Sequence, residues 1–589
     1  MKIYIVAFIT SLVVGLTAAL MISGTVGPEI DAITGTFTKS SKSAEQEGSH
    51  SPLEPAVRMT FTTGDELVDD LAYTTYALGL SKSAAYKVNK AVNGFLGTLD
   101  GSRPSAVAIF FREGKTKPNL LFCLPVVDRA NFENRLNKFG NIHTQDGQTV
   151  LATRGMGTLY LKQRGSYMFI SGSKTILKQL PSERVLFESH AGKYDIGLDV
   201  DPTMIPESLK TKFFQSMEKG AHDRPAQTRS EQELVDKWLR EMESMIFDTK
   251  RFVMGVNIDT KRNRFTLESK LIGLEDSMIA EEAKRNLEMQ PTQFGGFIRK
   301  GAGFNLNCCS NTWSDEMLQY GKIFGDTFQE LEEITVDSRP GKSEIHRWMR
   351  EFGAVLGETL QSERIDFGVT GVVKSGKLAV AMGLHVPNGA RFEEAILGFF
   401  DGASRNDPSA SYRPKFAQHG EIVFHQLEFR LPDDDQSRTV FGDSMMLTFG
   451  TGNSAAYLAL GERGFELLKK SIDDSVGKQY RGPVTMRADG QFSPWLAMVP
   501  NDTSDSRYLR SLIQNSSKVD RISFYSKPIE GGYKSRLELE MGFVRIAWKS
   551  VKRGIDRYIQ NAGGFGPVRV FSDTDQVPFS SMMRLGGEN

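Results

Sequence analysis

The sequence predicts an α+β protein made of two duplicated halves, each with an antiparallel sheet of strand-turn-strand-helix units covered by helices. Three observations predict this class. A unit of two strands, a short turn and a helix recurs four times, and a second block of strands recurs twice behind it. The chain has 589 residues, which is too long for one ordinary core. Recurrence of one pattern in a fixed order is best explained by duplication.

The clearest unit covers residues 364–400. In its first strand, 365–373, apolar and polar residues alternate with the period of two that a half-buried strand requires. The sequence KSGK at 374–377 supplies a turn, because Gly376 can adopt positive φ. Residues 378–386 are apolar on both faces, which predicts a more central strand, and 391–400 have the apolar spacing of a helix.

The other copies of this unit begin near Ser105, Arg251 and Asp520. The second block occupies residues 149–180 and 421–472, and in the later copy we expect a helix to begin at Asn453. The chain is therefore expected to divide into a first α+β half at 56–290 and a second at 291–561.

The N-terminus indicates export. Residues 3–22 are almost wholly apolar, which is long enough to span a bilayer, and no clear A-x-A cleavage site follows. Residues 1–24 are predicted to be a transmembrane anchor or, alternatively, a cleaved signal peptide. The polar segment 25–55 is predicted to be a flexible stalk, and 562–589 a loosely ordered tail. The body would face an extracytoplasmic compartment of the cell envelope, or be secreted or periplasmic after cleavage.

Composition excludes some classes of protein. Lys and Arg number 72 and so do Asp and Glu, so the formal net charge is zero and no nucleic acid partner is expected. The three cysteines, Cys123, Cys308 and Cys309, are too few for a disulfide framework.

Motifs for catalysis and cofactors are weak. The G-x-G-x-x-A pattern at 450–455 is compatible with dinucleotide binding, but a capped strand-to-helix turn is the preferred interpretation. The acidic loop at 432–436 lacks the ligand spacing of a calcium site. Asp199 and Asp201 are interpreted as turn and cap residues. No metal or cofactor is expected, and the absence of catalytic motifs makes an enzyme the less favoured class.

In its N-terminal hydrophobic segment, polar stalk and repeated strand-turn-strand-helix order, the chain resembles uncharacterised exported bacterial proteins with a duplicated α+β body of unknown function. The resemblance covers residues 55–561 and implies an extracytoplasmic α+β body. It implies no catalytic residue.

Three functional hypotheses remain at this point. The leading one is a non-enzymatic binding or scaffold protein, membrane-anchored or exported, with an unknown protein as its partner. The alternatives are an envelope hydrolase with a site assembled between the halves, and a carrier of an apolar ligand.

Junctions between duplicated halves are preferred ligand sites, and here aromatic residues and a basic pair are interleaved with glycines. The possible interface residues are Phe294, Phe297, Arg299, Lys300, Phe304 and Trp313. Alternatively, the aromatic residues pack the two halves together.

Overall fold

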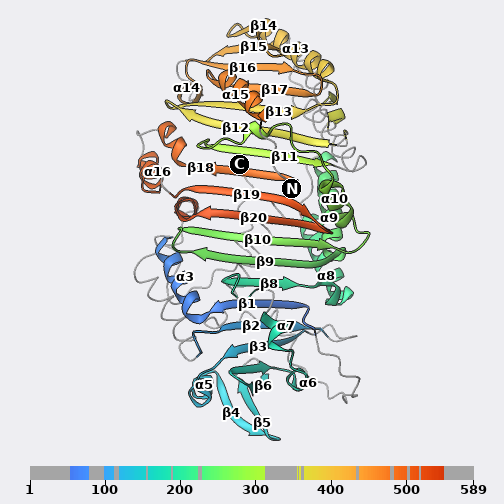
Figure 1. The fold of residues 1–589 in the computed structure, drawn as a ribbon, viewed down its shortest axis with the longest axis vertical. Coiled ribbons are helices and arrows are strands. Elements are labelled where there is room, and N and C mark those ends of the chain that lie inside the picture. Colours follow the sequence, from blue (N-terminus) through green and yellow to red (C-terminus); the bar gives the residue numbers. More distant parts are fainter. Residues whose placement is uncertain are drawn as a thin grey trace.

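One antiparallel sheet of twenty strands runs the length of the part of the chain that the structure, a computed structural model, describes (Figure 1). That part comprises residues 54–77, 99–111, 118–153, 157–187, 190, 192–222, 229–311, 354–355, 357–359, 362, 364–432, 437–477, 483–499, 504–516 and 519–549. With strands about 4.8 Å apart, the sheet is about 90 Å from edge to edge.

Residues 56–290 are called the first half and residues 291–561 the second half. The strands of the first half are β1 (Val57–Thr63), β2 (Pro104–Phe110), β3 (Asn119–Pro125), β4 (Gly140–Gln145), β5 (Gln148–Thr153), β6 (Gly157–Arg164), β7 (Tyr167–Ser171), β8 (Ile196–Val200), β9 (Thr249–Asp259) and β10 (Arg264–Gly273). Those of the second half are β11 (Phe304–Asn311), β12 (Arg364–Lys374), β13 (Lys377–His385), β14 (Ala410–His419), β15 (Ile422–Arg430), β16 (Ser444–Thr451), β17 (Ala455–Leu460), β18 (Met486–Gln491), β19 (Arg521–Ile529) and β20 (Gly532–Glu540).

The pairings place the first ten strands in the order β4-β5-β6-β7-β3-β2-β1-β8-β9-β10. The second ten follow as β20-β19-β18-β11-β12-β13-β17-β16-β15-β14. The two series meet where β10 pairs with β20, and there Glu268 lies opposite Arg536. The sequence suggested a separate sheet for each half, whereas the structure has a single sheet through both. The pairing of β10 with β20 satisfies two strand edges that would otherwise lack hydrogen-bond partners.

Helices cover both faces of the sheet toward each end (Figure 1). Near β4, α5 (Arg129–Leu136) packs on one face, where Phe132 joins the core, and α6 (Lys174–Lys178) and α7 (Glu183–Phe187) pack on the other. Near β14, α13 (Gly389–Asn406) covers the same face as α5. On the face that carries α6 and α7, α15 (Gly464–Gly477) and η3 (Gly295–Phe297) cover this end of the sheet. Both α5 and α13 begin at an Asx cap, Asp128 and Asn388 respectively.

The remaining helices lie beside the middle strands and the sheet margins. They are α3 (Gly64–Ala77), η2 (Pro202–Met204), α8 (Glu207–His222), α9 (Arg229–Phe247), α10 (Met278–Leu287), α14 (Ser437–Phe441), η4 (Ser493–Met498) and α16 (Ser504–Gln514), and residues 541–549 are also helical.

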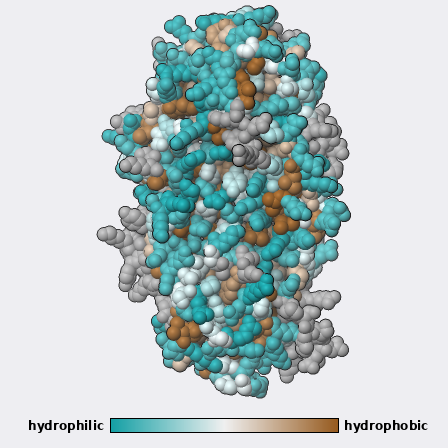
Figure 2. All heavy atoms as spheres, in the orientation of Figure 1, coloured by the Kyte–Doolittle hydropathy of each residue, from teal (hydrophilic) through white to brown (hydrophobic). Residues whose placement is uncertain are grey.

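The middle of the sheet has one apolar and one polar face. The apolar face carries Met59, Leu198, Met254 and Leu267, which form one core cluster across β1, β8, β9 and β10. The alternate residues of the same strands and of β18 to β20 are mostly polar or charged, with Val253 and Ile272 among the apolar exceptions. Hydrophilic side chains cover most of the surface seen in Figure 2. Strand register places this polar face on the side of the sheet covered by α6 and α7 at one end and by α15 and η3 at the other.

The four predicted hairpins are confirmed as β2–β3, β9–β10, β12–β13 and β19–β20. In the turn between β12 and β13, Ser375 and Gly376 both have positive φ, as a two-residue hairpin turn requires. The interpretation of 450–455 as a capped strand-to-helix turn is wrong, because this segment connects β16 to β17. The helix expected from Asn453 begins only at Gly464, as α15, because residues 455–460 form β17 between β13 and β16. The alanines in this run favour helix intrinsically, but pairing on both sides overrides that preference.

Residues 1–24, the predicted stalk as far as 53 and the tail 562–589 lie outside the described residues. Within the described ranges, no helix is both long enough and apolar enough to cross a membrane.

Candidate functional site

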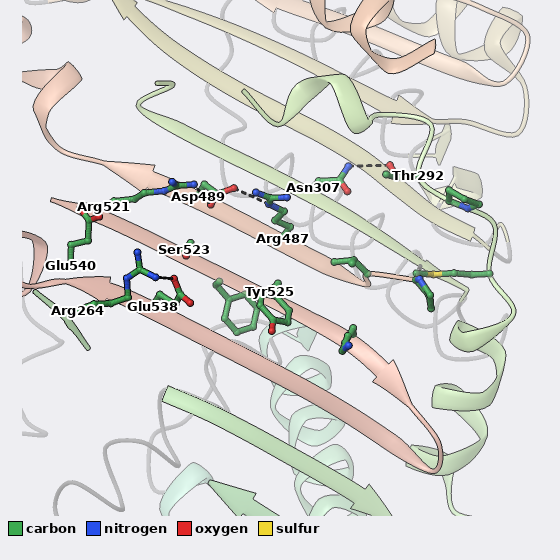
Figure 3. A pocket seen from close by; sticks show the side chains of 16 residues that line it. Arg264, Thr292, Asn307, Arg487, Asp489, Arg521, Ser523, Tyr525, Glu538 and Glu540 are labelled. Carbon is green, nitrogen blue, oxygen red and sulfur yellow. Dashed lines mark hydrogen bonds and ion pairs between the residues drawn. The ribbon is translucent and has the colours of Figure 1, made fainter. Parts of the chain in front are cut away.

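A hollow of about 470 Å³ lies on the polar face, close to where the two halves of the sheet meet (Figure 3). Arg264 reaches it from the first half, and β11, β18, β19 and β20 form most of its floor. The segment after α10 closes one side. The lining residues are Arg264, Met289, Pro291, Thr292, Asn307, Pro483, Val484, Arg487, Asp489, Arg521, Ser523, Phe524, Tyr525, Lys527, Glu538 and Glu540.

Strand alternation produces this polar floor. Ser523 lies opposite Glu538 on one side and opposite Asp489 on the other, so all three side chains project from the same face. The intervening residues, such as Leu537, belong to the opposite face, where Leu537 packs against the central apolar cluster. The hollow is therefore polar because of the two-residue period of β18, β19 and β20.

At the junction of the halves, ion pairs link two carboxylates and three cationic side chains. Nη1 of Arg264 is 2.8 Å from Oε2 of Glu538, and Nη2 of Arg536 is 2.6 Å from Oε1 of the same carboxylate. Arg536 also donates to Glu268 at 3.0 Å, and Lys534 lies 3.4 Å from Glu268. Although burial opposes it, these cations and the hydrogen bond from Tyr194 hold the pKa of Glu268 below its usual range.

A second group of charges lies deeper in the second half. Asp489 is 7% exposed and is engaged by Arg487 at 3.0 Å and by Arg521 at 3.1 Å. The backbone N–H of Arg521 donates to Glu540 at 2.9 Å. On one wall of the hollow, Asn307 donates to the hydroxyl of Thr292 at 3.0 Å (Figure 3). Thr292 in turn donates to Asp366 at 2.6 Å.

A third group lies on the same face in the first half. Asp199, on β8, accepts from Nε of Arg251 at 3.0 Å and from Nη2 at 2.7 Å, and it also pairs with Arg58. Burial favours the protonated carboxyl, but the hydrogen bonds from Arg251 and the charge of Arg58 outweigh it and lower the pKa of Asp199. Asp199 is therefore an ion-pair residue, and the expectation that it is a turn or cap residue is wrong. Asp201 does cap η2, as expected.

The Asp199 and Asp489 groups occupy matching positions in their halves. Asp199 lies opposite Val253, two residues after Arg251 on the next strand. Asp489 lies opposite Ser523, two residues after Arg521 on the next strand.

Several buried titratable groups lie near the start of β8. Asp70 and Asp195 are 5% and 6% exposed, and burial raises their pKa values to about 7 and about 6. Burial lowers the pKa of His190 to about 4. Within the described residues, no group of three or more His, Cys, Asp or Glu side chains is arranged to hold a metal ion.

The residues predicted for the junction have different surroundings. Phe294 and Phe297 are 1% and 0% exposed and pack against Ala381, Ala459 and Leu468 of the second half. They therefore anchor the connecting segment to the second half, and they present no surface to a partner.

The other junction residues lie nearer the surface. Arg299 pairs with Asp474 at 2.9 Å, Lys300 is exposed, and Phe304 stacks on Trp495 on the opposite face of the sheet. Trp313 lies outside the described residues. A role in an interface stays a prediction for Arg299, Lys300, Phe304 and Trp313.

Sequence reasoning missed the arginines of the polar face. Arg251, Arg264, Arg487 and Arg521 stand singly in their strands, so no local run marks them. The available signal was that Arg251 and Arg521 each begin the first strand of a matching hairpin unit.

No family model matches this sequence, and no curated protein matches it. A solved structure described as crystal form IV of TP0453 is similar over 41% of this chain and 87% of that chain, with 13% identity and a TM-score of 0.21. A score this low carries no argument about fold or function.

Proposed function

We propose that the chain is a non-enzymatic binding protein of the cell envelope, and that its ligand occupies the hollow between the two halves. The observation that carries this proposal is the hollow itself, which both halves line and in which three arginines and one lysine outnumber three carboxylates. Ligand sites are commonly concave and lie at junctions between domains.

The chemistry of the lining favours binding over hydrolysis. The hydroxyls of the lining belong to Thr292, Ser523 and Tyr525, and the lining contains no histidine to activate them. Asp489 and Glu538 accept hydrogen bonds from arginines, so their oxygens are engaged in holding side chains.

The same lining favours a polar ligand over an apolar one. Seven of the lining residues are charged: Arg264, Arg487, Asp489, Arg521, Lys527, Glu538 and Glu540. An apolar molecule would have to displace water from these groups without replacing its hydrogen bonds, which is unfavourable.

The placement in the envelope rests on residues 3–22, whose apolar length suits a membrane anchor or an export signal. Cell fractionation with N-terminal sequencing tests it. An intact N-terminus in the membrane fraction supports the anchor, whereas a soluble form that begins near Thr25 supports cleavage. A soluble cytoplasmic form would contradict both.

We also infer that the two halves arose by duplication. The common pairing order and the matching positions of the Asp199–Arg251 and Asp489–Arg521 pairs support this origin. An experimental structure tests it by superposition of residues 56–290 on 291–561. Halves whose strands cannot be superposed in one order would contradict it.

Substitution of Ser523 by Trp tests the binding function, because it places a large side chain on the floor of the hollow. Ser411→Trp is the matched control, because Ser411 is an exposed strand residue opposite Glu428, far along the sheet. Each full-length protein would be purified from its native envelope, and its bound small molecules would be identified by mass spectrometry. Loss of a ligand from Ser523→Trp but not from the control, with an unchanged melting temperature, is expected. Equal ligand content in both variants would contradict binding in the hollow.

A further inference from the structure

We propose that the ligand is an acidic polysaccharide, which extends from the hollow across the polar face as far as Asp199. This inference rests on the proposed function, because it identifies the chemical class of the ligand and lengthens its site. The features that carry it are three carboxylates on one face, each of which is engaged by two arginines.

These three groups are called the arginine triads. They are Asp199 with Arg58 and Arg251, Glu538 with Arg264 and Arg536, and Asp489 with Arg487 and Arg521. Each triad carries one surplus positive charge. The other charged side chains of the middle strands on this face balance, because Lys270, Lys527 and Lys534 are equalled in number by Asp259, Glu268 and Glu540. The face as a whole is therefore cationic, although the chain is neutral.

In the Asp199 and Asp489 triads, the carboxylate is more deeply buried than its arginines. Asp199 is 2% exposed and Arg251 is 42% exposed, while Asp489 is 7% exposed and Arg521 is 52% exposed. A buried carboxylate fixes the plane of the guanidinium above it, so less side-chain freedom is lost when a ligand binds. A guanidinium has five N–H donors, and Asp199 accepts only two from Arg251.

The triads form a diagonal row. Five strand spacings separate β8 from β18. Asp199 lies opposite Val253 on β9, which lies opposite Lys270 on β10, which lies opposite Lys534 on β20. Lys534 is four residues from Glu538 along β20. With about 4.8 Å between strands and about 3.4 Å per residue, Asp199 and Asp489 lie about 25–30 Å apart. A single small anion cannot span this distance, but a chain with repeated negative charges can.

The surroundings of the arginines favour a polysaccharide over a nucleic acid. Thr292, Asn307, Ser523 and Tyr525 offer neutral hydrogen-bonding groups, and Glu540 offers an acceptor for hydroxyl groups. Carboxylates would repel a continuous phosphate backbone, whereas a sugar chain has hydroxyls between its charges. Nucleic acid sites also use several stacking aromatics, and among the described residues of β18, β19 and β20 Tyr525 is the one aromatic ring that strand register directs into this face.

Binding of defined oligogalacturonates to the full-length protein, measured by calorimetry, tests the proposal. A long oligomer is expected to bind, with an affinity that falls as salt concentration rises, and neutral dextran is not. Arg521→Gln and Arg251→Gln should each weaken binding of the long oligomer about tenfold. A disaccharide, which reaches one triad, should lose affinity with one of these variants and not with the other.

Two further variants keep the test decisive. Lys527→Glu reverses an exposed charge at the hollow, so it should weaken binding even if the Gln variants fold poorly. Arg413→Gln is the matched control, because Arg413, which pairs with Glu428, lies on β14, the edge strand of the sheet, seven strand spacings from β18. It should leave binding unchanged.

The outcomes separate the two proposals. If the long oligomer is insensitive to Arg251→Gln and Ser523→Trp still removes a ligand, the extended site is wrong and the binding function stands. Equal binding of dextran, or tighter binding of a DNA oligonucleotide, would overturn the acidic polysaccharide. If neither oligogalacturonate binding nor ligand content responds to any variant of the hollow, both proposals fail.

Discussion

Gly368 on β12 lies directly opposite Gly383 on β13, and the side chains of Phe294 and Phe297 occupy the space above this pair. A Cβ atom at Gly368 would lie 2.7 Å from Cβ of Phe294, and one at Gly383 would lie 2.4 Å from Cδ1 of Phe294. The glycine pair therefore allows the segment between the halves to pack against the sheet.

Substitution of Gly368 by Ala tests this packing. The added methyl group overlaps Cβ of Phe294, which cannot move without its backbone, so stability should fall by about 1–3 kcal/mol. Gly172→Ala is the control, because a Cβ there meets nothing within 4 Å, and it should change stability by less than about 0.5 kcal/mol. Urea denaturation measures both. Equal stability of the two variants would show that the segment does not pack at the glycine pair.

Phe297→Ala should lower the free energy of unfolding by about 3–5 kcal/mol, because Phe297 is fully buried and its removal leaves a cavity. Phe139→Ala is the matched control, since Phe139 is 50% exposed, and its loss should be small. Thermal and urea unfolding check the difference. A Phe297→Ala protein that kept its stability but lost a co-purifying partner would restore the interface hypothesis for this residue.

The hairpin units were predictable because their signals are local. Alternation and turn residues identified β12 and β13 within one residue of their observed ends. The single sheet was not predictable, because β10 and β20 pair across more than 260 residues and nothing local records the pairing. The arginine triads were missed for a similar reason. Arg264 and Glu538 form an ion pair through strand register, and neither residue stands in a recognisable motif.

Ionisation of Asp70 should lower the free energy of unfolding as pH rises. Burial, and then the charge of Asp195, raise its folded-state pKa from 3.8 to about 7. A carboxyl with a raised pKa binds its proton more tightly in the folded protein, so its contribution is fully present below pH 4 and is lost between pH 4 and 7. Asp70→Asn should therefore raise stability on the order of 1–3 kcal/mol above pH 7, and not at pH 4.

Urea denaturation of the Asp70→Asn variant between pH 4 and 8 measures this dependence. Asp65→Asn is a control on the same helix, because Asp65 is exposed at its first turn. A benefit of Asp70→Asn that was equal at pH 4 and pH 8 would contradict the raised pKa.

The matching Asp199 and Asp489 groups predict parallel responses to substitution. Asn in place of either aspartate leaves two arginines without their anion. Asp199→Asn should cost about 2–3 kcal/mol, and Asp489→Asn less, because Arg58 is 19% exposed whereas Arg487 is 36% exposed and can be hydrated. Asp401→Asn is the control, since the Asp401–Arg405 pair is exposed on α13, and it should cost less than about 0.5 kcal/mol.

The pH dependence of the Asp199 variant gives an independent check. Because its folded-state pKa lies below 3.8, the ionised carboxyl adds stability that is present above pH 4 and is lost as pH falls through that lowered value. The difference between wild type and Asp199→Asn should therefore be largest near pH 7 and shrink toward pH 2. A difference that persisted undiminished in acid would mean that Asp199 stabilises the fold by packing, and that its charge does not hold Arg251 in place.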